Sequence, residues 1–119
     1  MKFITKEIHA YLDYPVAIGL ILAPFILDLG ESSSLALWLS VVTGVAAFIL
    51  TVFTDHHLGI IRILSYKTHL LVDFLVGVTF VLAPTLFGFS GIDAIFYWIN
   101  GFTVLTVVSL HRPEVEKAS

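Results

Sequence analysis

The chain has 119 residues, of which 58% are hydrophobic and only 13% are charged. A soluble domain is roughly 45–50% apolar and about 25% charged, so this composition excludes an ordinary soluble protein and indicates a lipid bilayer as its partner. The net charge of −3 without a basic patch excludes a nucleic-acid-binding protein. The absence of cysteine excludes disulfides and thiolate metal sites.

Four apolar segments follow one another along the chain, at residues 10–28, 34–53, 69–88 and 92–110. Each has about 19 or 20 residues and makes a helix of roughly 28–30 Å, long enough to cross the hydrocarbon core. They predict four transmembrane helices. The first segment follows two lysines, as the apolar core of a signal peptide would. Its later copy lies in mid-chain, however, so both segments are predicted to be permanent spans.

The chain contains one segment twice, because residues 2–50 align with residues 62–110 without a gap. The matched residues include His9, Asp13, Pro24, Trp38 and Thr43, which recur as His69, Asp73, Pro84, Trp98 and Thr103. Such a duplication predicts two stacked copies of a two-helix unit, repeat 1 at 1–59 and repeat 2 at 60–119, packed as a single domain over 1–119. Two helices return the chain to the same side of the membrane, so the copies should be parallel and related by a pseudo-two-fold axis.

Basic residues predict the orientation of these helices. All six of them precede the first span, lie between the second and third, or follow the fourth: Lys2, Lys6, Arg62, Lys67, Arg112 and Lys117. The positive-inside rule therefore predicts a multi-pass protein with both termini and the central loop in the cytoplasm. Trp38 and Trp98 then lie near the outer ends of the second and fourth spans, where interfacial tryptophans are common.

Two pairs of ionisable residues lie within the predicted spans. His9 and Asp13, and again His69 and Asp73, are four residues apart, which places imidazole and carboxylate on one helix face. Ionisable groups inside a membrane are costly and indicate function by default. If the first and third helices face each other, the four groups could bind a divalent metal such as Zn²⁺.

Three other roles of these pairs stay open. Histidine titrates near neutral pH, so the same groups could relay protons. Each pair could also do no more than hold helices together through hydrogen bonds. A membrane-embedded enzyme that uses them as acid and base is the third alternative. The chain has no Gly-rich phosphate loop, nucleophile elbow or H-E-x-x-H pattern, so nothing else in it indicates an enzyme.

Prolines recur past the middle of the first and third spans, at Pro24 and Pro84. Proline in a helix frees the carbonyl four residues earlier, here that of Leu20 or Phe80, and predicts a kink. We expect these kinks to have a structural role in helix packing. A further polar group, Asp55-His56-His57, is interpreted as the interfacial end of the second span.

These motifs together resemble those of the SPW-repeat family of small bacterial integral membrane proteins. The resemblance rests on H-x-x-x-D followed by L-A-P in each half, on F-G-F-S-G at 87–91, and on the junction at 54–62. The family is named for a Ser-Pro-Trp motif, of which Ala23-Pro24-Phe25 and Ala83-Pro84-Thr85 keep only the proline. The resemblance implies a bacterial inner membrane protein and identifies no reaction.

We therefore expect an all-α membrane protein with four transmembrane helices from two tandem two-helix repeats. The leading functional hypothesis is a polar site in the cytoplasmic leaflet, made by His9, Asp13, His69 and Asp73, that binds a metal ion or relays protons. The alternative is a structural or interaction subunit without a ligand. A chain of this length encloses little interior volume in four spans, which favours a homodimer.

Overall fold

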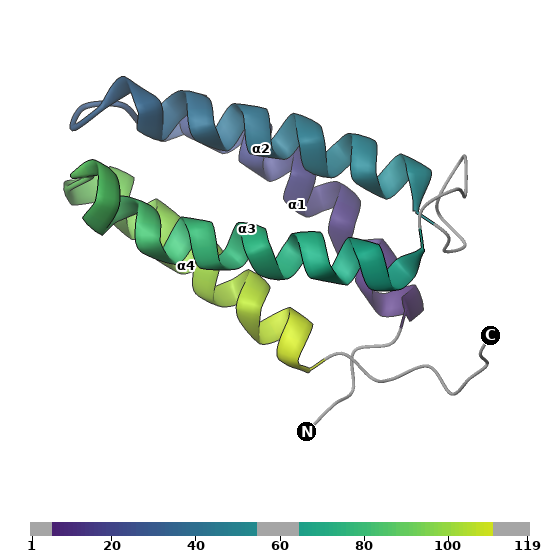
Figure 1. Ribbon diagram of the computed structural model, residues 1–119. Coiled ribbons are helices and arrows are strands. Elements are labelled where there is room, and N and C mark those ends of the chain that lie inside the picture. Colours follow the sequence, from purple (N-terminus) through teal and green to yellow (C-terminus); the bar gives the residue numbers. More distant parts are fainter. Residues whose placement is uncertain (1–5, 55–64, 111–119) are drawn as a thin grey trace.

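The computed structural model describes residues 6–54 and 65–110, without the side chains of residues 6, 7, 9, 10 and 66. This part of the chain forms four helices, α1 (Lys6–Ile26), α2 (Ser34–Phe53), α3 (Tyr66–Phe87) and α4 (Gly91–Ser109) (Figure 1). They coincide within a few residues with the four apolar segments of the sequence, so the all-helical prediction is confirmed.

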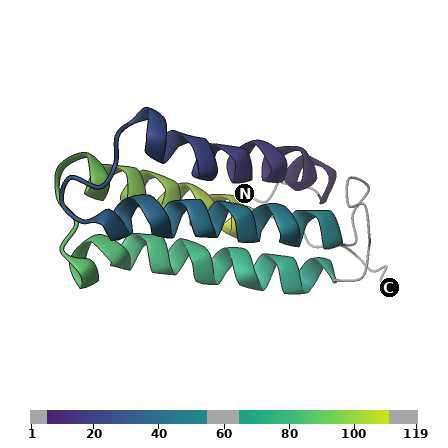
Figure 2. The same ribbon diagram turned by 90° about the horizontal axis from the view of Figure 1, so that it is seen from above.

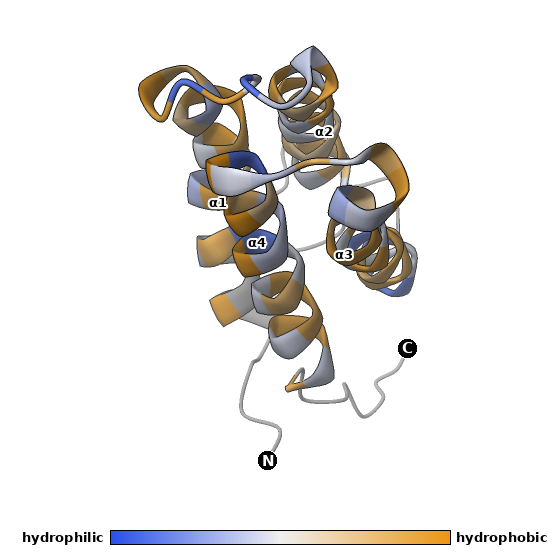
Figure 3. Ribbon diagram, turned by 90° about the vertical axis from the view of Figure 1, so that its left-hand side faces the viewer, coloured by the Kyte–Doolittle hydropathy of each residue, from blue (hydrophilic) through white to orange (hydrophobic). Residues whose placement is uncertain are grey.

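The helices have the length and surface of membrane spans. Among the described residues, α2, α3 and α4 are long and apolar enough to cross a bilayer, whereas the apolar part of α1, Tyr11–Ile26, is shorter. Hydrophobic residues predominate along the helices (Figure 3). Many of their large apolar side chains are exposed, and Ile26 keeps 78% of its surface exposed and Leu86 69%. Exposing such an apolar surface is unfavourable in water but not in the hydrocarbon core of a membrane. The fold is therefore that of a multi-pass membrane protein.

The four helices form two hairpins. Helix α1 packs along α2 and α3 packs along α4, while α2 also contacts α3. Both short connections, 27–33 and 88–90, lie at the left in Figure 1, and α2 lies beside α3 when the molecule is seen from above (Figure 2). The opposite end, called the site end below, holds the start of α1, the end of α2 and the start of α3.

A glycine permits close helix contact within each hairpin. A Cβ atom on Gly44 of α2 would lie 2.8 Å from the carbonyl oxygen of Ala17 in α1. A Cβ atom on Gly101 of α4 would lie 3.0 Å from the carbonyl oxygen of Gly77 in α3. Both glycines therefore let two backbones approach more closely than any other residue would allow.

The equivalent glycine contacts of the two hairpins do not involve residues that the sequence alignment matches. Ala17 corresponds to Gly77 in the gapless alignment, but Gly44 corresponds to Val104 rather than to Gly101. The helix starts differ in the same way, because Ser34 and Gly91 are three residues closer than the alignment requires. The longer connection 27–33 accounts for this difference. Equivalent contacts therefore follow the alignment on α1 and α3 and are displaced by three residues on α2 and α4.

Tyr97 lies at the centre of the apolar core and links the two hairpins. It is fully buried, and its ring centroid lies 4.5 Å from that of Phe80 and 4.9 Å from that of Phe89. Its hydroxyl donates a hydrogen bond of 2.6 Å to the carbonyl oxygen of Ala36 in α2. A buried tyrosine needs such a partner, and here the partner belongs to the other hairpin.

The helices α1 and α3 continue through their prolines. Pro24 and Pro84 lie inside the helices, and α1 contains Pro15 as well. The carbonyl of Leu20, which Pro24 deprives of its helical donor, accepts a hydrogen bond of 2.8 Å from the buried hydroxyl of Ser40. Neighbouring serines often compensate a proline in this way. The kinks predicted at Pro24 and Pro84 stay a prediction.

Candidate metal centre

Three ionisable side chains from two helices meet at the site end of the bundle. Asp13 comes from α1, and His69 and Asp73 come from neighbouring turns of α3. One ligand atom from each residue can be chosen so that all three lie within 4.8 Å of one another. His69 is 1% exposed, and both carboxylates are partly buried. The cluster therefore joins the first hairpin to the second.

The imidazole of His69 is the centre of this cluster. Its Nε2 atom lies 3.1 Å from Oδ2 of Asp13 and 3.3 Å from Oδ2 of Asp73. The contact with Asp73 is the expected interaction between residues four apart on one helix. The contact with Asp13 crosses between the hairpins. His69 therefore does not interact only with the aspartate of its own repeat.

Thr54 completes the surroundings of His69 at the end of α2. Its Oγ1 donates a hydrogen bond of 2.6 Å to the carbonyl oxygen of Leu50 and lies 2.7 Å from Nδ1 of His69. A hydroxyl has one proton, so with that proton on the Leu50 carbonyl the oxygen of Thr54 accepts a hydrogen from Nδ1. Nε2 of a neutral imidazole then has no proton and directs its lone pair toward the two carboxylates.

This arrangement requires a proton or a cation between Nε2 and the carboxylates. A bare lone pair that faces two carboxylates is repelled, so the cluster needs a second proton on the ring, a proton on one of the carboxyl groups, or a metal cation. Zn²⁺ bonds to nitrogen and oxygen are about 2.0–2.1 Å long, which makes the edges of a tetrahedral ligand set about 3.3 Å. The two distances at His69 fit such edges, and the carboxylate oxygens of Asp13 and Asp73 lie within 4.8 Å of each other.

The structure brings together three of the four residues that the sequence proposed for this site. Asp13, His69 and Asp73 meet, whereas the side chain of His9 lies outside the described residues. The polar group at 55–57 also lies outside them. Thr54 was missed. The sequence shows that a hydroxyl residue directly follows the apolar run of α2, but nothing in it connects this residue to His69.

A second polar cluster ties the hairpins together at the opposite end. Asp93, in the first turn of α4, is fully buried, and its carboxylate accepts hydrogen bonds from the backbone N–H of Gly30 at 2.9 Å and from that of Ser32 at 3.0 Å. The hydroxyl of Ser32 donates to the same carboxylate. These three donors all come from the connection between α1 and α2. No motif in the sequence indicated this role of Asp93.

The two tryptophans have different contacts. Trp38 packs edge to face on Phe25, and the indole N–H of Trp98 donates to the carbonyl oxygen of Val81 at 3.1 Å. Their exposed fractions are 54% and 42%. Both lie in the half of α2 or α4 that is nearer to the short connections. Their position at the outer membrane interface stays a prediction.

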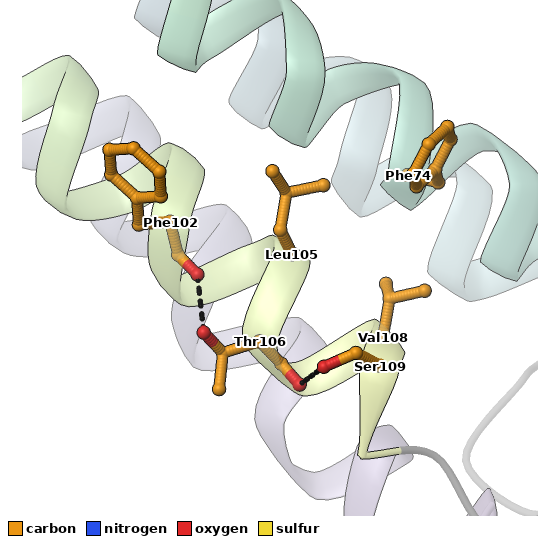
Figure 4. A pocket seen from close by; sticks show the side chains of 6 residues that line it. All are labelled: Phe74, Phe102, Leu105, Thr106, Val108 and Ser109. Carbon is orange, nitrogen blue, oxygen red and sulfur yellow. Dashed lines mark hydrogen bonds between the residues drawn. The ribbon is translucent and has the colours of Figure 1, made fainter.

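An open groove lies between α3 and α4. It has a volume of about 490 Å³ and is lined by Phe74, Phe102, Leu105, Thr106, Val108 and Ser109 (Figure 4). The hydroxyls of Thr106 and Ser109 donate to carbonyl oxygens of their own helix. The groove therefore offers an apolar surface, and no ionisable side chain lines it.

Fold and site together define a class: a small all-α membrane protein whose hairpins are joined by a cluster of one buried histidine and two partly buried aspartates. The chain belongs to the SPW repeat domain family, whose model matches residues 7–111. No curated protein and no solved structure matches the chain. The resemblance noted from the sequence is therefore confirmed.

Proposed function

We propose that this membrane protein binds a divalent metal ion, such as zinc, between its two hairpins, with Asp13, His69 and Asp73 as ligands. The observation that carries the proposal is the position of Nε2 of His69, within 3.3 Å of carboxylates from two different helices. Three protein ligands leave one coordination position for water or for a further side chain. His9 is the candidate for that position, as the repeat pattern predicts.

Charge balance favours a divalent cation over a proton. Two carboxylates beside a neutral imidazole carry two negative charges, which one divalent cation cancels. A proton on the imidazole cancels only one of them. A single divalent cation would therefore offset the charge of both carboxylates, which favours a metal over a proton on the ring.

A proton relay is the second candidate function. The hydroxyl of Thr54 and the ring of His69 form a continuous series of short contacts that ends at Asp13 and Asp73. Such a series of titratable and hydroxyl groups can transfer a proton. The remaining alternatives are a scaffold, in which His69 only fastens the hairpins, and a membrane enzyme.

Thermal melts of the detergent-purified protein test the metal site. We expect Zn²⁺ to raise the melting temperature of the wild type, because an ion that binds only the folded state at 100 times its Kd adds about 2.7 kcal/mol. Asp73→Asn should abolish this shift. Asp28→Asn, the same substitution at an exposed site outside the cluster, should keep it. The shift should also vanish at acid pH, because protons compete with the metal for its ligands.

Other outcomes of these melts decide between the alternatives. A wild type without any zinc-dependent shift would exclude the metal site and leave the scaffold and the proton relay. A shift that persists in Asp73→Asn would assign zinc binding to other residues. His9→Ala shows whether the fourth predicted ligand takes part. If it does, the effects of His9→Ala and His69→Ala should not add, because both remove ligands from one site.

We further propose the membrane arrangement that the sequence predicts: four spans in a bacterial inner membrane, both termini in the cytoplasm, and two parallel repeats related by a pseudo-two-fold axis. The matched glycine contacts of the two hairpins and the six basic residues at the site end or in the segments adjoining it support it. The small interior of four helices supports a homodimer. The metal centre would then lie in the cytoplasmic leaflet.

Cysteine labelling tests this topology, because the native chain contains no cysteine. An impermeant thiol reagent added outside intact cells should label single cysteines at Ser33 and Ser90, in the two short connections. It should not label cysteines at Ser65 and Ser119 unless the cells are permeabilised. Labelling at Ser65 from outside would reverse the orientation and move the centre to the other leaflet.

A further inference from the structure

We propose that Thr54 is a positioning residue of the metal centre, which directs Nε2 of His69 toward the cation by accepting a hydrogen bond from Nδ1. This inference rests on the proposed metal site. It goes beyond that site because it assigns a role to a residue that cannot reach the ion through its own hydroxyl, which is already engaged by Leu50 and His69.

Two short distances carry the inference. Oγ1 of Thr54 lies 2.6 Å from the carbonyl oxygen of Leu50, and two oxygen atoms this close need a proton between them. The hydroxyl of Thr54 therefore donates its proton to the hydrogen bond with the carbonyl oxygen of Leu50. The contact of 2.7 Å between Oγ1 and Nδ1 then requires the proton of Nδ1, so the hydrogen bonds run in one direction from His69 through Thr54 to Leu50.

The location of Thr54 makes this role effective. The residue is fully buried and is the C-cap of α2, where the chain leaves the helix with an extended backbone. A histidine ligand commonly donates its other ring N–H to a neighbouring oxygen, which fixes the orientation of the ring and the nitrogen that remains for the metal. Thr54 supplies that oxygen from a third helix. The centre thus depends on α1, α2 and α3 together.

Without this hydrogen bond, the ring would favour the opposite protonation. Nε2–H could then donate to Asp13 or Asp73, both within 3.3 Å, and that charge-assisted bond would compete with a metal ion for Nε2. Thr54 therefore acts on metal affinity by stabilising the Nδ1–H form of His69. This role requires an acceptor oxygen at the position of the hydroxyl and does not require the methyl group.

Two variants with matched shapes test the role of Thr54. Thr54→Val keeps the branched shape and removes the acceptor, whereas Thr54→Ser keeps the acceptor and removes the methyl group. We expect Thr54→Val to weaken Zn²⁺ binding, measured by calorimetry in detergent, about 10- to 100-fold, in line with losses at other partners of metal-bound histidines. Thr54→Ser should bind zinc with nearly the wild-type affinity.

Nitrogen NMR of His69 in the metal-free protein, recorded at alkaline pH where the ring carries a single proton, separates this inference from the metal site itself. Nδ1 should have the chemical shift of a protonated ring nitrogen in the wild type and in Thr54→Ser, and should lose that shift in Thr54→Val. A wild type with unprotonated Nδ1 would overturn the inference, as would a Thr54→Val variant with unchanged Nδ1 and unchanged affinity. Protonated Nδ1 together with no zinc binding would support the role of Thr54 and reject the metal site.

Discussion

Adding one methyl group at Gly44 is expected to lower the free energy of unfolding by about 1–3 kcal/mol, the usual cost of overpacking. The new Cβ atom would lie 2.8 Å from the carbonyl oxygen of Ala17 and 2.9 Å from the backbone nitrogen of Ile21. Backbone atoms cannot rotate away as the end of a side chain can. Helices α1 and α2 would therefore have to separate along their contact.

Gly19→Ala is the matched control for Gly44→Ala. Gly19 also lies inside a helix, but a Cβ atom there would meet nothing within 4 Å. Alanine should therefore stabilise the protein at this position by up to about 1 kcal/mol through its better helix propensity. Unfolding in detergent mixtures, followed by circular dichroism, measures both variants. Equal effects at Gly44 and Gly19 would contradict the close helix contact.

The hydropathy pattern was sufficient to predict the helices because each span must satisfy its own backbone hydrogen bonds in lipid. A long apolar segment therefore has one local solution, the α-helix. The spacing of His69 and Asp73 was equally informative, since residues four apart on a helix always share a face. The convergence of α1 and α3, which brings Asp13 to His69, was only a condition of the hypothesis and required the structure.

Thr54 and Asp93 could not be predicted because their roles depend on contacts between hairpins. A threonine after an apolar run ends many helices, and its position beside His69 follows from the packing of α2 against α3. The partners of Asp93 come from the longer connection 27–33. The gapless alignment hid this difference in length, because the pairs Trp38–Trp98 and Thr43–Thr103 follow the sequence offset while the helix contacts do not.

The Asp93 cluster fastens the bundle at the end opposite to the proposed metal centre, and its removal should be costly. Asp93→Ala leaves the backbone N–H groups of Gly30 and Ser32 without their acceptor, and hydrogen bonds to a charged group contribute about 1.5–3 kcal/mol each. We expect a loss of about 2–4 kcal/mol in the free energy of unfolding. Glu31→Ala, in the same connection but exposed, should change it by less than about 0.5 kcal/mol.

The same variant also tests whether the two ends of the bundle act independently. Asp93 shares no partner with His69 among the described contacts, and distant sites without shared partners usually contribute additively. Asp93→Ala should therefore lower the melting temperature and still leave the zinc-dependent rise intact, and its cost should add to that of Asp73→Asn within about 0.5 kcal/mol. Loss of the zinc response in Asp93→Ala would instead mean that the hairpins move as rigid units about the Asp93 cluster, so that metal binding at one end depends on the contact at the other.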